Sequence, residues 1–424
     1  MRIAMMTNNY KPYIGGVPIS VERLAQGLRE LGHIVYIFAP DYPDGVEEDP
    51  YVIRYGSFSW KLHGDVRVPN CFDPLIEDIF RFLDIDIIHV HHPMLIGQTA
   101  LRLGRKYHIP VVFTYHTRYE MYLHYLKPYA ALQKQVRVSK GTLFPKMGEG
   151  LLKAVREQIV PGFIRHFIDQ CDMVIAPSHT MEQHLDSLGT ETPVEVLPTG
   201  LPDSAFSPDG QSAAALRLQM LKGKKYLFCT VSRLSEEKNL FFMLDGLSCL
   251  KKRIGDSFQM VFLGDGPIKD GLIKQAESSG ISSCVSFLGC LPNELLPVYY
   301  QSCDAFLFSS LSETQGIVLL EAMAAGCPVV AVDASGTRDT VVSGENGFLT
   351  GCNAEEWAGK AAEIVLDNVL HQHLSDGARR SAVEYHTSKI ALQMQRNYIH
   401  ALQKFEYANA FGRMGNFLPQ NHHI

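Results

Sequence analysis

The 424-residue sequence contains no uninterrupted apolar run of about 18 residues, the minimum that a helix needs to cross a bilayer. It also lacks an apolar stretch of secretory type after Met1, so we expect a cytoplasmic protein. Its nine cysteines include no CxxC pair, and Cys229 and Cys327 lie in apolar segments. We therefore expect reduced core thiols rather than disulfides or a metal site.

The overall composition is that of a globular protein with a sizeable core. Hydrophobic residues make up 46% of the chain and charged residues 20%, and the length implies more than one domain. The formal net charge is −6, and no known nucleic-acid-binding motif is present. Nucleic acid is therefore not an expected partner.

Short apolar segments typical of strands alternate with helical segments in two successive sets, which predicts a doubly wound α/β fold in two similar lobes. The predicted strands are 3–7, 35–39, 87–91, 111–116 and 173–176, then 226–231, 258–263, 285–288, 305–309 and 329–332. Residues 196–202 are rich in Pro and Gly and form the expected linker. We therefore predict one domain over 1–198 and a second over 199–389.

Two glutamates bracket the junction between a predicted strand and the helix after it. Glu313 lies in the loop and Glu321 about one turn into the helix, beside backbone amides that attract phosphate. Carboxylates accept hydrogen bonds from sugar hydroxyls, and Gly316 lets the backbone approach a ligand closely. A phosphorylated sugar is therefore a suitable ligand. The alternative is an acidic turn that only complements the helix dipole.

Two further loops follow predicted parallel strands, so they are expected at the same edge of the sheet. Arg233 and Lys238 follow one strand and supply two cations for phosphate groups. Gly264 and Asp265 follow the next strand, where glycine permits a tight turn near a nucleotide. Taken alone, the first loop is an ordinary solvated loop and the second an ordinary turn.

Together these residues resemble the donor site of glycosyltransferase family 4, and the resemblance runs from Arg2 to about Lys389. It implies the GT-B fold, in which two Rossmann-like domains face a central cleft. The C-terminal domain then binds the nucleotide-sugar donor and the N-terminal domain binds the acceptor. The resemblance also implies that a final helix at about 390–410 packs back on the N-terminal domain, and we expect no fold from Phe411 onward.

The resemblance implies a role for each site residue. His116, Arg233, Lys238 and Glu313 are the catalytic candidates: the two cations neutralise the leaving diphosphate, His116 contacts the donor sugar, and Glu313 positions it. The expected donor-binding residues are Gly15, Gly16, Gly264, Asp265, Cys290, Leu291, Thr314, Gln315, Gly316, Ile317 and Glu321. Gly15 and Gly16 would admit the donor's distal phosphate near backbone amides.

No metal or other cofactor is expected. His89, His91 and His92 stand just before Pro93, but residues along a strand face opposite sides in turn, so fold contacts are preferred for them. The segment 84–86 resembles the acidic motif of metal-dependent glycosyltransferases, yet it opens a buried strand. With Arg233 and Lys238 neutralising the diphosphate, the electrostatic role of a metal is filled. The resemblance also implies that the anomeric configuration is retained.

The segment 101–170 carries twelve Lys or Arg and four Asp or Glu, a charge of +8, so the remainder of the chain carries −14. Its basic residues are interleaved with apolar ones, which predicts contact with an anionic membrane surface. The alternative is a core-facing helix with solvated lysines. The candidate acceptor or membrane residues are Arg118, Tyr119, Tyr122, Lys134, Arg137, Lys140, Lys153 and Arg156.

The stretch 116–125 resembles the corresponding part of diacylglycerol glucosyltransferases within the family. The leading hypothesis is transfer of glucose from UDP-glucose to diacylglycerol at the cytoplasmic face of a membrane. The alternatives are the same chemistry on a soluble sugar, a polyol or phosphatidylinositol, with GDP-mannose as a possible donor. A nucleotide-sugar epimerase and a non-catalytic sensor are further alternatives, and the sequence leaves the oligomeric state open.

Overall fold

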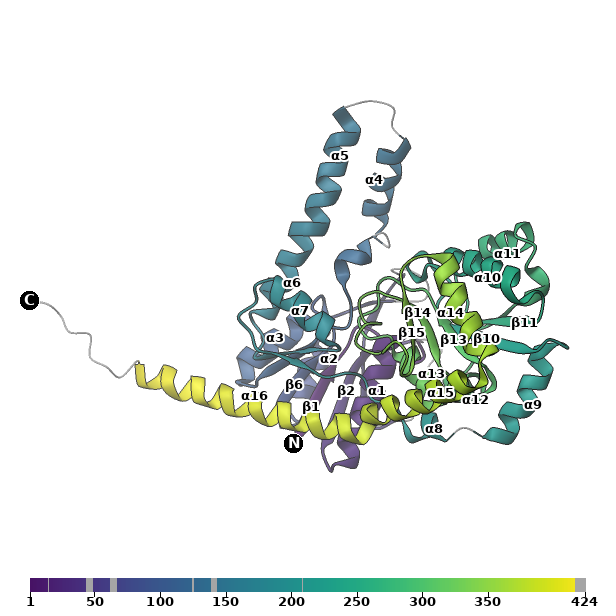
Figure 1. Ribbon diagram of the computed structural model, residues 1–424. Helices are drawn as coiled ribbons and strands as arrows, with labels where there is room; N and C mark the ends of the chain where they lie inside the picture. Colours follow the sequence, from purple (N-terminus) through teal and green to yellow (C-terminus); the bar gives the residue numbers. More distant parts are fainter. Residues whose placement is uncertain are drawn as a thin grey trace, which may run out of the picture. The chain divides into compact units, whose positions relative to one another are not determined.

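The computed structural model describes residues 1–13, 15–42, 49–61, 67–123, 126–138, 143–207 and 209–415 (Figure 1). The chain divides into two compact units, one comprising Met1–Leu197 with Ile390–Ile424 and the other Pro198–Lys389. The boundary between Leu197 and Pro198 falls inside the linker expected at 196–202. Among the described residues, no helix combines the length and the hydrophobicity that a membrane span requires.

The first unit is built on a parallel seven-stranded sheet in the order β3-β2-β1-β6-β7-β8-β9. The strands are β1 (Arg2–Met6), β2 (Ile34–Pro40), β3 (Val52–Tyr55), β6 (Ile87–Val90), β7 (Val111–Thr114), β8 (Met173–Ala176) and β9 (Val194–Val196). β4 (Ser57–Lys61) and β5 (Arg67–Pro69) form a separate antiparallel pair. The edge strands β3 and β9 were not predicted, because they are short and only partly buried.

The helices of the first unit connect these strands. They are α1 (Gly16–Glu30), α2 (Pro74–Phe80), α3 (Ile96–Tyr107), η1 (Tyr119–Met121), α4 (Lys127–Val138), α5 (Leu143–Ala154), η3 (Val155–Ile159), α6 (Val160–Ile168) and α7 (His179–Ser187). Residues 143–168 form one continuous helical rod, because the π-helical turn η3 joins α5 directly to α6. α4 and α5 pack against each other and extend away from the sheet of this unit (Figure 1).

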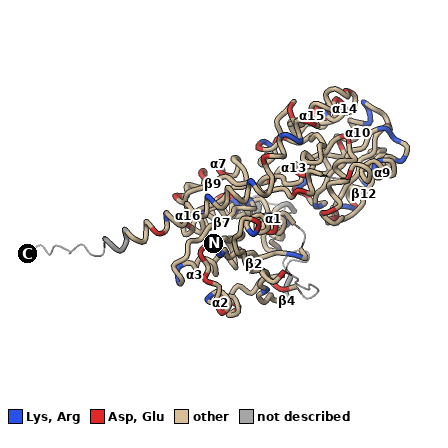
Figure 2. The backbone as a smooth tube through the Cα atoms, turned by 90° about the horizontal axis from the view of Figure 1, so that it is seen from below, with Lys and Arg blue, Asp and Glu red and all other residues tan. Residues whose placement is uncertain are grey.

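The second unit contains a parallel six-stranded sheet in the order β12-β11-β10-β13-β14-β15. The strands are β10 (Tyr226–Val231), β11 (Phe258–Leu263), β12 (Val285–Gly289), β13 (Ala305–Phe308), β14 (Val329–Val332) and β15 (Gly347–Thr350). The helices include α8 (Asp203–Phe206), α9 (Gly210–Leu221), α10 (Leu240–Ile254), α11 (Lys269–Ser278), α12 (Leu296–Ser302), α13 (Ile317–Ala324), α14 (Ala354–Leu366) and α15 (Asn368–Ala382). Basic and acidic residues are interspersed on α10, α14 and α15 (Figure 2).

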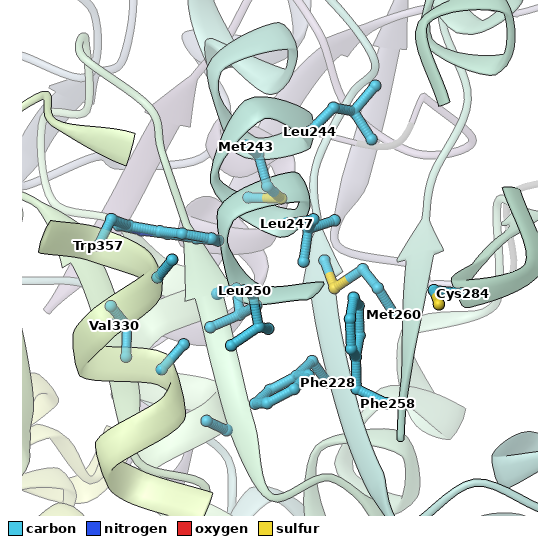
Figure 3. Close-up of a cluster of buried hydrophobic side chains, with 14 of the residues drawn as sticks. Phe228, Met243, Leu244, Leu247, Leu250, Phe258, Met260, Cys284, Val330 and Trp357 are labelled. Carbon is cyan, nitrogen blue, oxygen red and sulfur yellow. The ribbon is translucent and has the colours of Figure 1, made fainter. Parts of the chain in front are cut away.

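The core of the second unit shows why this alternation of strands and helices folds. Leu244, Leu247 and other apolar residues of α10 recur at helical spacing and pack on Phe228 and Met260 of the sheet (Figure 3). Trp357 of α14 is fully buried in the same cluster. It lies so close to Gly246 that an added Cβ there would come within 2.5 Å of its ring. Burial of each such large side chain contributes roughly 1.5–3 kcal/mol.

The C-terminal helix α16 (Thr387–Gly415) belongs to the first unit from Ile390 onward. Its residues Met394 and Tyr398 are buried in the same cluster as Ile3 and Met5 of β1. The expectation that no fold follows Phe411 is wrong, because the helix extends to Gly415. No proline interrupts the sequence between Thr387 and that residue, so nothing forces an earlier end.

Candidate active site

The strand order of the second unit reverses at one point. From β10 the chain moves outward to β11 and β12 and then returns to β13 on the other side of β10. In doubly wound sheets, ligands bind at the carboxyl ends of the strands where the order reverses. The loops that leave β10 and β13 carry Arg233, Lys238 and Glu313, so the predicted cations and carboxylate follow the two strands at this point.

Lys238 and Glu313 form an ion pair across this point, with Lys238 Nζ 2.5 Å from Glu313 Oε1. Both side chains are largely buried, with 18% and 16% of their surface exposed. Ser309 Oγ donates to the carbonyl of Lys238 at 2.8 Å, and Ser335 Oγ donates to that of Glu313 at 2.8 Å. Side-chain hydrogen bonds therefore join the loop after β13 to the loops after β10 and β14.

The turn into α13 is fixed by a glycine. Gly316 has φ +76°, and an added Cβ would come within 2.8 Å of the Leu319 side chain. The buried side chain of Gln315 bonds the backbone N–H and carbonyl of Thr199 at 2.8 and 3.2 Å, so it fastens the loop within the unit. Its neighbour Thr314 is half-buried, and Ile317 is the first residue of α13.

Glu321 lies one turn into α13, as the sequence indicated. Its Oε2 accepts a hydrogen bond from the hydroxyl of Tyr300 in α12 at 3.2 Å. No sequence signal pointed to Tyr300, because nothing in the spacing relates α12 to α13. Tyr300 is fully buried, so it holds the Glu321 carboxylate from the core side.

The loop after β11 packs closely against the loop after β10. Gly264 has φ +134°, and an added Cβ would come within 2.0 Å of the Ser232 carbonyl, so only glycine fits. The Asp265 carboxylate accepts from the Gly266 N–H at 2.7 Å and from Lys269 at 3.2 Å, and these bonds lower its pKa. Cys290 and Leu291 follow β12, with Cys290 exposed and Leu291 half-buried.

In the first unit the strand order reverses between β1 and β6. Gly15 precedes α1 in extended conformation and has no side chain that could cap the helix. An added Cβ on Gly16 would meet no atom within 4 Å, so space adjoins the first turn. The Asn8 N–H donates to His92 Nδ1 at 3.1 Å, which links the loops after β1 and β6. Gly16 would accept a methyl group without a clash, whereas a Cβ on Gly15 would come within 3.0 Å of the Tyr13 ring.

His116 was predicted to end a strand, but β7 ends at Thr114, two residues earlier. His116 Nε2 lies 2.9 Å from His91 Nδ1, and the two rings stack with centroids 5.2 Å apart. Burial holds the pKa of both imidazoles well below its usual range. Both rings are therefore neutral at pH 7.

The remaining histidines contact the fold. His89 lies between Tyr398 Oη at 2.7 Å and Thr114 Oγ1 at 2.6 Å, and burial lowers its pKa to about 3. Burial lowers the pKa of His92 to about 4. Within the described ranges, no group of three or more His, Cys, Asp or Glu side chains is placed to hold a metal ion. Asp84 pairs with Arg2 at 2.7 Å, away from the histidines.

The candidate acceptor residues fall into two groups. Arg118 pairs with Glu120 at 2.8 Å, while Tyr119 packs against Tyr115 with ring centroids 6.1 Å apart, and Tyr122 is half-buried. In the second group, Lys134, Lys153 and Arg156 are exposed on the α4–α6 helices. Lys140 and the side chain of Arg137 lie outside the described residues.

These features define a glycosyltransferase of the GT-B fold, which the comparisons with known proteins bear out. A family model described as "Glycosyltransferase Family 4" matches residues 14–204, and one described as "Glycosyl transferases group 1" matches residues 216–381. The chain belongs to glycosyltransferase family 4.

Two curated relatives share one name, "Alpha-monoglucosyldiacylglycerol synthase". The protein from Streptococcus pneumoniae is 31% identical over 78% of this chain and 71% of its own length. The protein from Acholeplasma laidlawii is 28% identical over 95% of this chain and 98% of its own length. A "GDP-mannose-dependent alpha-mannosyltransferase" from Corynebacterium glutamicum is 25% identical over 94% of this chain and 88% of its own length. The relatives thus include two diacylglycerol glycolipid synthases and a mannosyltransferase that depends on GDP-mannose.

Solved structures show the same fold. HepE of Anabaena, determined in complex with UDP, superposes with a TM-score of 0.71 at 19% identity and covers 94% of this chain and 99% of its own. The predicted α/β class and GT-B fold are therefore confirmed.

Proposed function

We propose that the protein transfers glucose from UDP-glucose to the free hydroxyl of diacylglycerol, with retention of configuration and without a metal ion. The observation that carries this proposal is the pairing of Lys238 with Glu313 where the strand order of the second unit reverses. A nucleotide sugar has a diphosphate for the cation and sugar hydroxyls for the carboxylate. The likeness to the two diacylglycerol enzymes supports the choice of acceptor.

In the proposed reaction the bond between the anomeric carbon and the diphosphate oxygen breaks, and a bond to the acceptor oxygen forms on the same face. The acceptor's hydroxyl proton passes to the departing phosphate oxygen, so no carboxylate acts as nucleophile and acid. Negative charge grows on the diphosphate, and Arg233 and Lys238 stabilise it. Glu313 holds the sugar and Glu321 the ribose. Gly15 and Gly16 admit the distal phosphate, and His116 contacts the sugar.

The ion pair has a consequence for donor binding. Lys238 and Glu313 neutralise each other in this structure, so the diphosphate must draw Lys238 partly away from the carboxylate. Glu313 is then released to accept hydrogen bonds from the sugar hydroxyls. The sugar thus replaces part of the interaction that Glu313 loses, and a bare nucleoside diphosphate does not.

The proposed membrane contact is the continuous helical rod 143–168. Met147, Leu151, Ile159 and Phe163 expose 68%, 53%, 59% and 40% of their surface. In an unbroken α-helix these four positions would spread over about 160° of the circumference. The π-helical turn η3 adds one residue to a turn, so the residues after it are rotated about the rod axis by about 100° relative to an unbroken α-helix. This rotation brings the four side chains within about 60° of one another around the rod. The four side chains therefore form one apolar stripe.

Basic residues accompany the apolar stripe. Lys153 and Arg156 are exposed on the same rod, and both lie near Glu157, at 3.9 and 2.9 Å. Exposed pairs of this kind contribute little, about 0–1 kcal/mol, so an anionic lipid can compete for both cations. Each basic residue adds about 1 kcal/mol of attraction near an anionic leaflet. We infer reversible attachment to the cytoplasmic face of an anionic membrane.

A second candidate function keeps the chemistry and changes the substrates. The likeness to a GDP-mannose-dependent mannosyltransferase favours GDP-mannose as the alternative donor. Cys290 and Leu291, near the expected base, offer no charged side chain that would select uracil over guanine. A phosphatidylinositol, soluble sugar or polyol acceptor would accompany that donor.

The test is transfer of labelled glucose by the purified chain to diacylglycerol in vesicles that contain phosphatidylglycerol. We expect labelled glucosyldiacylglycerol with UDP-glucose and little product with GDP-mannose, and no loss on addition of EDTA. Absence of labelled lipid from a folded preparation would overturn the proposed acceptor. Release of free sugar without an acceptor would instead indicate a hydrolase, and an altered nucleotide sugar would indicate an epimerase.

A further inference from the structure

His91 has no role in the function proposed so far, yet its ring contacts that of His116. It is 1% exposed at the end of β6, and its Nδ1 lies 2.9 Å from His116 Nε2. Its other nitrogen, Nε2, is buried and has no hydrogen-bond partner among the residues that the structure describes. A buried polar atom without a partner is unusual in folded proteins and requires an explanation.

The direction of the bond between the two imidazoles follows from that buried nitrogen. Both rings are neutral, so each carries one N–H, and one ring must donate to the other. If His116 donated, His91 would carry its hydrogen on Nε2, as a buried N–H without an acceptor. If His91 donates, its Nε2 is an under-satisfied acceptor instead. Among backbone groups, a buried N–H without an acceptor is rarer than a buried acceptor without a donor. By the same reasoning, donation from His91 to His116 is favoured.

His89 fixes the ring of His91 from the other side. The centroids of the two rings are 4.2 Å apart. His89 is itself held at both nitrogens, by Tyr398 of α16 and Thr114 of β7. Because both nitrogens of His89 are engaged, it does not compete for the bond between His91 and His116. The orientation of His91 is therefore set by packing against a ring that cannot turn.

We propose that His91 is a positioning residue that donates its Nδ1–H to Nε2 of His116 and thereby keeps the proton of His116 on Nδ1. This inference deepens the proposed function and rests on it for the role of His116. In this tautomer neither nitrogen of His116 has a free lone pair, since Nδ1 carries hydrogen and Nε2 accepts from His91. His116 then serves the donor sugar as a fixed polar contact and not as a general base. The acceptor's proton must leave by another route, which agrees with its transfer to the departing phosphate.

The direct test is the tautomer of His116 in the full chain labelled with [15N]histidine, read from long-range 1H–15N correlations at pH 7. The His116 signals are assigned by their loss in His116→Asn. We expect the Nδ1–H tautomer. The Nε2–H tautomer, or a protonated ring, would overturn the proposal. The spectrum is recorded without substrate, so it remains decisive if the chain transfers no glucose to diacylglycerol.

A pair of variants tests the consequence for turnover. His91→Asn keeps an N–H near the position of Nδ1, and we expect kcat within about threefold of the wild type. His91→Leu removes the donor, and we expect kcat to fall about tenfold while KM for UDP-glucose stays within about twofold. Equal losses in the two variants would contradict the proposal. If His91→Leu does not fold, the tautomer in the wild-type spectrum still decides whether the proposal holds. A large loss of kcat in a folded His91→Asn variant would also contradict the proposal.

Discussion

Lys238 Nζ lies 2.5 Å from Glu313 Oε1, so the cation expected to bind the diphosphate and the carboxylate expected to bind the sugar are paired with each other. Each residue follows a different strand, and those strands are neighbours although more than seventy residues separate the two side chains. The pair is the structural basis for the predictions about catalysis.

Removal of either cation should nearly abolish transfer. For Lys238→Ala and Arg233→Ala we predict a loss of a hundredfold or more in kcat, because loss of one group that stabilises developing charge costs roughly 3–4 kcal/mol. Steady-state transfer from UDP-glucose measures the effect, and circular dichroism checks the fold. Lys252→Ala, an exposed lysine of α10, is the matched control and should retain full activity.

Gly16, the first residue of α1, provides a test of whether the donor's distal phosphate binds at this helix end. Gly16→Ala adds a methyl group where no atom lies within 4 Å, so thermal stability should be unchanged or slightly higher. If the donor's distal phosphate approaches there, KM for UDP-glucose should rise about tenfold. An unchanged KM would place the phosphate elsewhere. Gly316→Ala, at φ +76°, should instead lower stability by about 1–2 kcal/mol.

The buried histidine His89 makes stability depend on pH. The unfolded chain binds a proton on this imidazole below about pH 6.5, whereas the folded chain remains neutral until the pH approaches about 3. Protonation therefore favours the unfolded state, and stability is lost as the pH falls below 6.5. Urea unfolding between pH 7 and 5 should show a steeper fall in the wild type than in His89→Asn. The difference between the two proteins should total about 2 kcal/mol over this range, and equal slopes would contradict the neutral assignment.

The apolar stripe predicts which changes release the protein from membranes. Leu151→Glu with Ile159→Glu should lower binding to phosphatidylglycerol vesicles at least tenfold, because two apolar contacts are replaced by like charge. Leu218→Glu, at a leucine of α9 with 77% of its surface exposed, is the control and should bind as the wild type does. Vesicle sedimentation measures both. Unchanged binding by the double variant would exclude the stripe as the contact.

Deletion of one residue within 155–159 probes the π-helical turn itself. In an ordinary α-helix that is one residue shorter, the lost residue and the lost widening of the turn cancel, so Ile159 and Phe163 stay about 20° and 60° from Met147. Deletion of Glu157 or Gln158 should therefore leave vesicle binding within about twofold of the wild type. The buried side chains of Phe167 and Ile168 keep their direction as well, and weaker binding by a folded deletion variant would contradict this account of the stripe.

Sequence reasoning succeeded where the signal is local. Strands such as β8 and β13 are short, fully buried and flanked by helices, so their apolar runs mark them clearly. It failed at the edge strands β3, β9 and β15 and at the end of α16. β3 and β9 are only partly buried and have weak apolar patterns, whereas β15 is mostly buried but only four residues long. Nothing in the sequence marks where a solvated helix ends.

The residues of the candidate site could be named from the sequence, but their contacts could not. The cations and carboxylates stand at loop positions that the alternation of strands and helices places at one sheet edge. The pairing of Lys238 with Glu313 depends on side-chain packing across two loops. The bond between Tyr300 and Glu321 and the bond between His91 and His116 likewise join residues that no sequence period relates.

Calorimetric titration of the purified chain with UDP-glucose tests most directly whether these loops hold a nucleotide sugar. We predict saturable binding by the wild type and by Lys252→Ala, and binding at least tenfold weaker by a folded Lys238→Ala variant. Equal affinity in all three proteins, or no binding by the folded wild type, would contradict the proposed donor site.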